Sequence, residues 1–181
     1  MKTRYISPLL LAALIQFFAL SIYRIGHVAE PGIETEASEE REVNKKILVE
    51  LFLAAERKKD TDSIKKEFEA LSVIRVRPQF FRLGNPPENI AIGKNVPAPV
   101  ARLAIQIALT YNRGVKYLLP EFRYFPEHIV IGSSAFDEAS QVPITPGDLD
   151  RLSDPSLSTE EFHTLYRQLT GEDKRLPTYL D

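Results

Sequence analysis

The sequence contains no cysteine, and this absence removes several kinds of chemistry at once. Without cysteine the chain has no disulfide, no thiolate metal ligand, no thiol nucleophile and no cysteine that could carry an N-terminal lipid. Histidine is also scarce: the three histidines, His27, His128 and His163, are far apart in the sequence. We therefore predict no histidine-rich metal site and no cofactor, and a site made of carboxylates alone stays open.

A large excess of charge of one sign is missing as well. The chain has 23 Lys and Arg residues against 25 Asp and Glu residues, which gives a formal net charge of −2. Proteins that bind nucleic acid normally show a strong basic excess or a basic stripe, so we do not expect a nucleic-acid partner. The length of 181 residues and the apolar content of 44% suit one globular domain with additional segments.

The longest apolar run is at the N-terminus, within residues 1–29. Residues 6–23 are apolar except at four positions, Ser7, Pro8, Gln16 and Ser21. A helix of about 18 residues spans about 27 Å, which is enough for a thin hydrocarbon core. The segment predicts an uncleaved signal anchor, and the alternative is a signal peptide that is cleaved near Ser21. The anchor is favoured because Ile22 and Tyr23 extend the apolar run past the cleavage site.

Charge around this run predicts the orientation of the chain in the membrane. Lys2 and Arg4 precede the run, and every Asp and Glu residue lies beyond residue 29. The positive-inside rule then keeps the N-terminus in the cytoplasm and exports the rest. We expect a single-pass membrane protein whose bulk is periplasmic or extracellular, or a secreted or periplasmic protein if the segment is cleaved. Residues 30–42 are acidic and predict an exposed linker.

Periodic patterns divide the rest of the chain into predicted elements. Val43, Ile47, Leu51 and Ala54 are spaced as on a helix over residues 43–58. Further helices are predicted over residues 64–71, 97–111, 145–152 and 158–170, and strands over residues 72–81, 90–93 and 115–119, with extended chain over 128–132. Residues 115–119 are apolar on both faces except Lys116, so we expect this strand to be central in its sheet. Residues 173–181 predict a loosely held tail.

Two phrases in the chain resemble each other, PQFFRLGNPPENIAIG at 78–93 and PEFRYFPEHIVIG at 120–132. With a gap of three residues they share Pro-x-Phe, then Pro-Glu-x-Ile-x-Ile-Gly, and each follows a helical pattern. We interpret residues 61–93 and 97–132 as a duplicated α-β-β unit, since two units can bury one shared sheet face that neither can bury alone. The alternative is coincidence among short strands rich in Ile and Pro.

The predicted fold class is therefore α+β. We expect a small mixed or antiparallel sheet with helices on one face, in a domain over residues 43–172 that ends in a helical part, 145–171. The N-terminal membrane or signal helix precedes this domain.

Chemistry is concentrated in residues 121–138. An envelope hydrolase would use Ser133 or Ser134 as nucleophile, His128 as base and Asp137 as orienting group. The spacing disfavours this interpretation, because residues 128 and 134 of one strand lie about 20 Å apart. The Gly-x-Ser-x-Gly elbow is also missing from this stretch. Alternatively, Glu121 and Glu127 would face one cleft as a pair of carboxylates, as in a glycosidase.

Arginine and aromatic residues recur in both phrases and are the residue types that anchor protein interfaces. The candidate interaction residues are Arg75, Arg77, Phe81, Arg82, Arg123 and Tyr124. Alternatively, the phenylalanines belong to the core and the arginines protect a sheet edge. We expect a membrane-anchored, exported and non-catalytic interaction or assembly domain with a partner in the cell envelope. The hydrolase, or a sensor domain with a small ligand between the repeats, are the alternatives.

Overall fold

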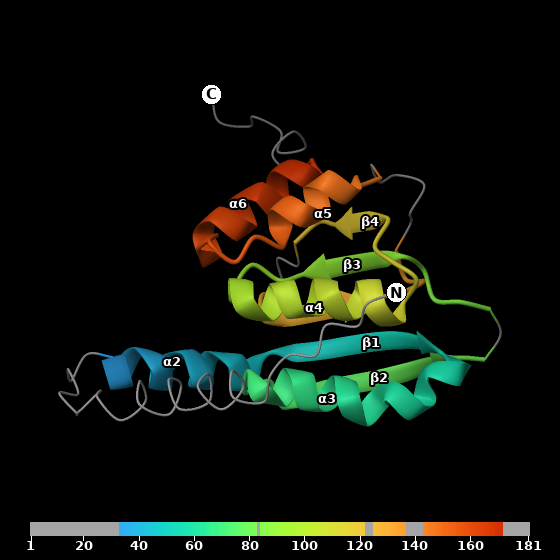
Figure 1. Ribbon diagram of the computed structural model, residues 1–181, viewed down its shortest axis with the longest axis horizontal. Coiled ribbons are helices and arrows are strands. Elements are labelled where there is room, and N and C mark those ends of the chain that lie inside the picture. Colours follow the sequence, from blue (N-terminus) through green and yellow to red (C-terminus); the bar gives the residue numbers. More distant parts are fainter. Residues whose placement is uncertain (1–32, 83, 122–124, 137–142, 172–181) are drawn as a thin grey trace, which may run out of the picture. The chain divides into compact units, whose positions relative to one another are not determined.

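The computed structural model describes residues 33–82, 84–121, 125–136 and 143–171 (Figure 1). Contacts divide the chain into two units, Met1–Ala37 and Ser38–Asp181, and of the first unit only the start of helix α2 is described. The predicted anchor, residues 6–23, and the predicted tail, residues 173–181, lie outside the described residues. Within the described ranges, no helix combines the length and the hydropathy needed to cross a membrane.

The second unit is built on one mixed sheet of five strands, in the spatial order β2-β1-β5-β3-β4. The strands are β1 (Leu48–Ala54), β2 (Arg75–Phe81), β3 (Asn89–Ile92), β4 (Tyr117–Leu119) and β5 (His128–Ile131). β1 pairs in parallel with both β2 and β5, β5 pairs antiparallel with β3, and β3 pairs in parallel with β4. The predicted α+β class with a mixed sheet is thus confirmed.

The predicted helix over residues 43–58 is wrong. Helix α2 (Ile33–Lys46) ends before this sheet, and residues 48–54 form the strand β1, with neighbours on both sides. β1 buries one face and leaves the other half-buried, and its apolar residues also fit a helical spacing. The period of two was nevertheless present, because Val49, Leu51 and Leu53 are the residues that β1 buries in the core.

Two helices cover one face of the sheet. Helix α3 (Thr61–Ala70) connects β1 to β2, with a short 3-10 helix, η1 (Ala55–Asp60), before it, and helix α4 (Ala98–Tyr111) connects β3 to β4. α3 and α4 lie on the same side of the sheet and contact each other (Figure 1). The apolar residues of α3, α4 and the strands beneath them form one core, in which Ile64, Phe68, Ala104 and Ile105 are fully buried.

The two predicted repeat units have the same order of elements. Residues 61–93 contain α3, β2 and β3, and residues 97–132 contain α4, β4 and β5. Gly93 and Gly132 directly follow β3 and β5, as the aligned phrases predicted. The duplication itself stays a prediction. The expected central position of residues 115–119 is wrong, because β4 is at one end of the sheet order.

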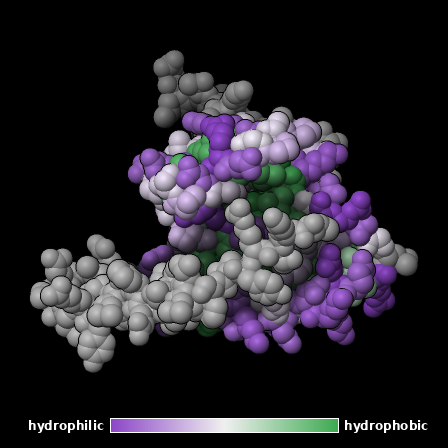
Figure 2. Space-filling view, in the orientation of Figure 1, coloured by the Kyte–Doolittle hydropathy of each residue, from purple (hydrophilic) through white to green (hydrophobic). Residues whose placement is uncertain are grey.

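Helices α5 (Pro146–Leu152) and α6 (Thr159–Thr170) form the C-terminal part, as predicted. Each begins with a capping box, Thr145 with Asp148 and Ser158 with Glu161, and α6 ends at Gly171 in the left-handed conformation. α6 packs against β4 and α4, so it shields the β4 end of the sheet. In Figure 2 most of the described surface is hydrophilic, and hydrophobic residues are visible in a hollow beneath α5 and α6.

Candidate functional site

The face of the sheet opposite α3 and α4 carries a cluster of charged side chains on β2, β1 and β5. Leu48 of β1 lies opposite Arg75 of β2 and His128 of β5, and Glu50 lies opposite Arg77. Residues opposite each other share a face of the sheet, and Val49 and Leu51 point to the other face, into the core. We call the cluster of Leu48, Glu50, Arg75, Arg77 and His128 the open face.

Charges on the open face are paired and act on one another. His128 Nε2 lies 3.2 Å from Glu50 Oε2. Burial lowers the pKa of His128, the Glu50 carboxylate opposes this shift, and Arg75 and Arg77 lower the pKa further. Arg75 Nη1 also donates a hydrogen bond of 3.1 Å to the carbonyl oxygen of Lys46, at the end of α2. The surroundings of His128, which include two guanidinium groups, therefore disfavour protonation of its ring.

A small pocket opens at the end of this cluster, where β1, β2 and β5 begin. Its volume is about 190 Å³, and it is lined by Lys46, Leu48, Arg75, Phe125, Pro126, Glu127 and His128. Phe125 is 62% exposed, and its ring packs edge-to-face on His128 at 6.0 Å between centroids. Glu127 Oε1 accepts a hydrogen bond of 2.9 Å from Asn95. The pocket thus combines cationic groups, an aromatic wall and one carboxylate with a partner.

Four of the six predicted interaction residues lie on β2 or beside it. Arg75, Arg77 and Phe81 belong to β2, and the exposed Arg82 follows directly. Phe81 packs edge-to-face on Phe52 of β1 at 6.2 Å between ring centroids, so this ring has a packing role. The other two predicted residues, Arg123 and Tyr124, lie outside the described residues.

The structure does not bring the described members of the predicted catalytic site together. His128 lies beside Glu50 on the open face, Glu121 contacts α6, and Ser134 is an exposed residue of the loop that follows β5. Asp137 lies outside the described residues. Glu121 is thus paired with His163, a histidine that the sequence analysis did not connect with it.

Glu121 and His163 form a buried pair. His163 Nδ1 lies 2.6 Å from Glu121 Oε1, and His163 Nε2 lies 2.7 Å from the carbonyl oxygen of Val96. A carbonyl oxygen only accepts hydrogen bonds, so Nε2 donates to Val96 and Nδ1 faces the carboxyl group. Arg167 of α6 is 3.7 Å from the other oxygen of Glu121. With the two side chains 5% and 7% exposed, the pair braces α6 against β4 and the turn before α4.

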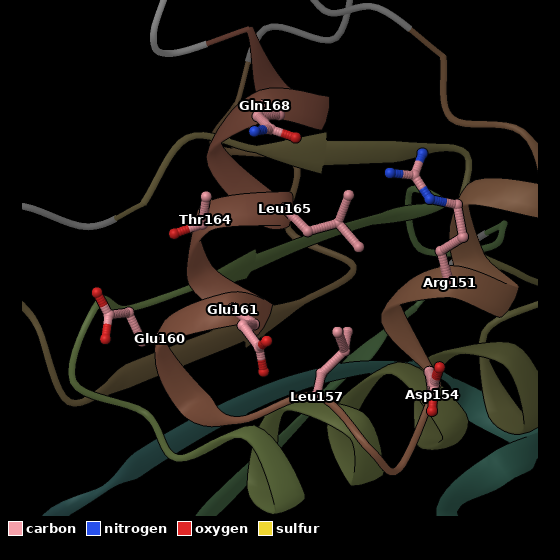
Figure 3. A pocket seen from close by; sticks show the side chains of 8 residues that line it. All are labelled: Arg151, Asp154, Leu157, Glu160, Glu161, Thr164, Leu165 and Gln168. Atoms are coloured by element: carbon pink, nitrogen blue, oxygen red, sulfur yellow. The ribbon is translucent and has the colours of Figure 1, made fainter.

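A second cavity lies between α5 and α6, with a volume of about 460 Å³ (Figure 3). Leu157 and Leu165 point into the space between the two helices, and polar side chains surround them (Figure 3). Two of its carboxylates already accept hydrogen bonds within their own turns, Asp154 from Ser156 and Glu161 from Ser158. Asp154 thus holds the turn between α5 and α6, and Glu161 caps the start of α6.

Within the described ranges, no group of three or more His, Asp or Glu residues is arranged to hold a metal ion. Comparisons of the chain with protein-family models, with curated proteins and with solved structures found no match.

Proposed function

We propose that this chain is a membrane-anchored, exported and non-catalytic interaction domain, which binds an extended acidic segment of a cell-envelope protein along strand β2. The observation that carries the proposal is the position of β2. It is seven residues long, it is at the end of the sheet order, and β1 is its neighbour among the described strands. An edge strand offers backbone N–H and C=O groups to a further strand, which is a common mode of peptide recognition.

The side chains of β2 favour an acidic occupant. Arg75 and Arg77 are both exposed, and they are successive residues on the side of β2 that belongs to the open face. A second copy of β2 would bring arginines close to arginines, which is unfavourable, whereas Asp or Glu residues of a partner strand would lie among cations. The arginines therefore discourage pairing between copies, and they select for a partner of opposite charge.

The membrane part of the proposal is supported by the N-terminal sequence. Residues 6–23 are long and apolar enough for one crossing, and the basic residues before them favour export of the domain. An anchor of this kind would hold β2 near other envelope proteins and raise the effective concentration of a partner.

The test is charge reversal on β2 in the full-length protein. Arg77→Glu should lower the recovery of the crosslinked partner by about tenfold, which corresponds to about 1.4 kcal/mol of binding free energy. Recovery is measured by quantitative mass spectrometry after crosslinking in membranes. Arg77→Gln, which removes the charge without placing a carboxylate opposite Glu50, should give a smaller loss in the same direction.

Lys94→Glu is the matched control. Lys94 is also an exposed cation, but it lies in the turn after β3, on the other half of the sheet. It should leave recovery of the partner unchanged. Equal recovery with Arg77→Glu and with Lys94→Glu would contradict a role for β2, provided that both variants keep the wild-type unfolding transition.

A further inference from the structure

We propose that the pocket lined by Lys46, Arg75 and His128 receives one carboxylate side chain of the acidic partner segment, and that this contact makes binding stronger at lower pH. The inference rests on the proposed function and adds the site at which one side chain of the partner is recognised. The pocket lies on the open face at the first residues of β1, β2 and β5, and His128 on β5 is two strand spacings, about 10 Å, from β2. A segment that pairs with β2 would therefore turn across the first residues of β1 to place a side chain in the pocket.

The size and donors of the pocket fit a carboxylate. Its volume of about 190 Å³ holds such a group with a few waters, each of which takes about 30 Å³ in the liquid. Arg75 uses one N–H for the carbonyl oxygen of Lys46, which orients the guanidinium and leaves further N–H groups for a ligand. A guanidinium binds a carboxylate through two parallel hydrogen bonds, and the Lys46 ammonium adds a second positive charge.

Negative groups near the pocket are already engaged. Glu50 lies against His128, and Glu127 accepts a hydrogen bond from Asn95. The carbonyl end of α2, which is the negative end of its dipole, is covered by the hydrogen bond from Arg75. The charged groups around His128 are therefore three cations, Lys46, Arg75 and Arg77, and two carboxylates that already have partners.

His128 makes the contact sensitive to pH. Burial and the two arginines hold the pKa of His128 below its ordinary value, so protonation of the ring in the free domain is unfavourable near neutral pH. An anion in the pocket offsets this repulsion and favours the protonated ring. By linkage, the carboxylate must bind more tightly to the protonated form, so affinity rises as pH falls through the pKa of His128. Affinity falls again only when the ligand carboxylate itself is protonated, at about pH 4.

The experiment follows the ring protons of His128 by NMR, in the full-length protein in detergent, with His128→Gln to assign the signal. The probes are N-acetyl-glutamate N-methylamide, which carries one carboxylate, and N-acetyl-glutamine N-methylamide, its neutral counterpart. At saturation, the glutamate probe should raise the titration midpoint of His128 by about one unit, and the glutamine probe should leave it unchanged. Affinity for the glutamate probe should rise about tenfold across this titration.

Arg75→Gln should remove the effect of the glutamate probe on His128 while the signals of His163 stay in place. An unchanged midpoint in the wild-type protein, or the same rise in Arg75→Gln, would overturn the proposal. Inorganic phosphate is a further arm, and a rise with phosphate but not with the glutamate probe would also overturn it. If the glutamate probe does not shift the His128 midpoint but recovery of the crosslinked partner still depends on Arg77, this inference alone is wrong. If recovery does not depend on Arg77, the proposed function of β2 is wrong.

Discussion

At the scale of single residues, Asn89 extends the pairing between β3 and β5. Its side chain donates to the carbonyl oxygen of Ser133 and accepts from the N–H of Ser133, both at 3.0 Å, and Asn89 is 1% exposed. The amide side chain thus takes the place of a backbone partner for Ser133, beyond the last paired residues of β3 and β5. The chain turns there at Gly132, which has a φ of 74°. The side chain of an alanine at position 132 would also lie 2.5 Å from the Asn112 amide, so only glycine suits this turn.

We predict that Asn89→Ala lowers the free energy of unfolding by about 2–4 kcal/mol, because two buried backbone groups lose their partners. The measurement is denaturant unfolding of the full-length protein. Asn95→Ala is the control: Asn95 is exposed and bonds to Glu127, so its loss should cost less than about 0.5 kcal/mol. Similar costs for the two variants would show that Asn89 does not have this role.

At the scale of elements, α6 is held by polar contacts as well as by its apolar face. The hydroxyl group of Tyr166 donates to the carbonyl oxygens of Ile90 and Leu119, at 3.2 and 2.7 Å, and accepts from the N–H of Ile92. The pair of Glu121 and His163 adds a second connection to the same region. α6 thus fixes the end of β4, the chain that leaves it and the turn before α4.

We predict that His163→Ala lowers the free energy of unfolding by about 2–4 kcal/mol, because the buried Glu121 loses its hydrogen-bond partner and keeps the more distant Arg167. The double variant Glu121→Ala with His163→Ala should cost clearly less than the two single variants together. Chemical denaturation measures all three. If the costs simply add, the two side chains do not act as a pair.

Most elements could be predicted from local patterns, and those that could not depend on distant contacts. α4 and α6 show a regular apolar stripe, and the capping boxes at Thr145 and Ser158 locate the starts of α5 and α6. β1 was missed because its partners, β2 and β5, are 27 and 80 residues further along the chain, as Leu48 opposite Arg75 and His128 shows. The apolar residues of β1 fit a helical spacing as well as a period of two, so the local pattern did not separate a strand from a helix.

The candidate site was predictable to the same degree. Arg75, Arg77, Phe81 and Arg82 are neighbours in sequence, so composition alone grouped them. Glu50 and Lys46 join them through the register of β1, and His163 reaches Glu121 across 42 residues, which no spacing rule reveals. Local sequence thus located one strand of the site, and tertiary pairing supplied its other members.

At the scale of the whole molecule, the sheet separates two regions with different tasks. Helices α3, α4 and α6 bury one face and stabilise the fold, while the open face and the edge of β2 keep charged groups accessible. The proposed N-terminal anchor, which lies outside the described residues, would keep the domain close to the membrane. Binding would then depend on strand pairing for affinity, and on the arginines and the pocket for selectivity.

The central claim is that β2 contacts an acidic segment of a partner, and site-specific photocrosslinking tests it most directly. A photoreactive amino acid replaces the exposed Gln79 on β2, or Lys94 as control, in the full-length protein in membranes. We predict a crosslink from position 79 to one segment rich in Asp and Glu, which Arg77→Glu abolishes, and none from position 94. Equal crosslinks from both positions, or a crosslink from position 79 to a segment without acidic residues, would contradict the account.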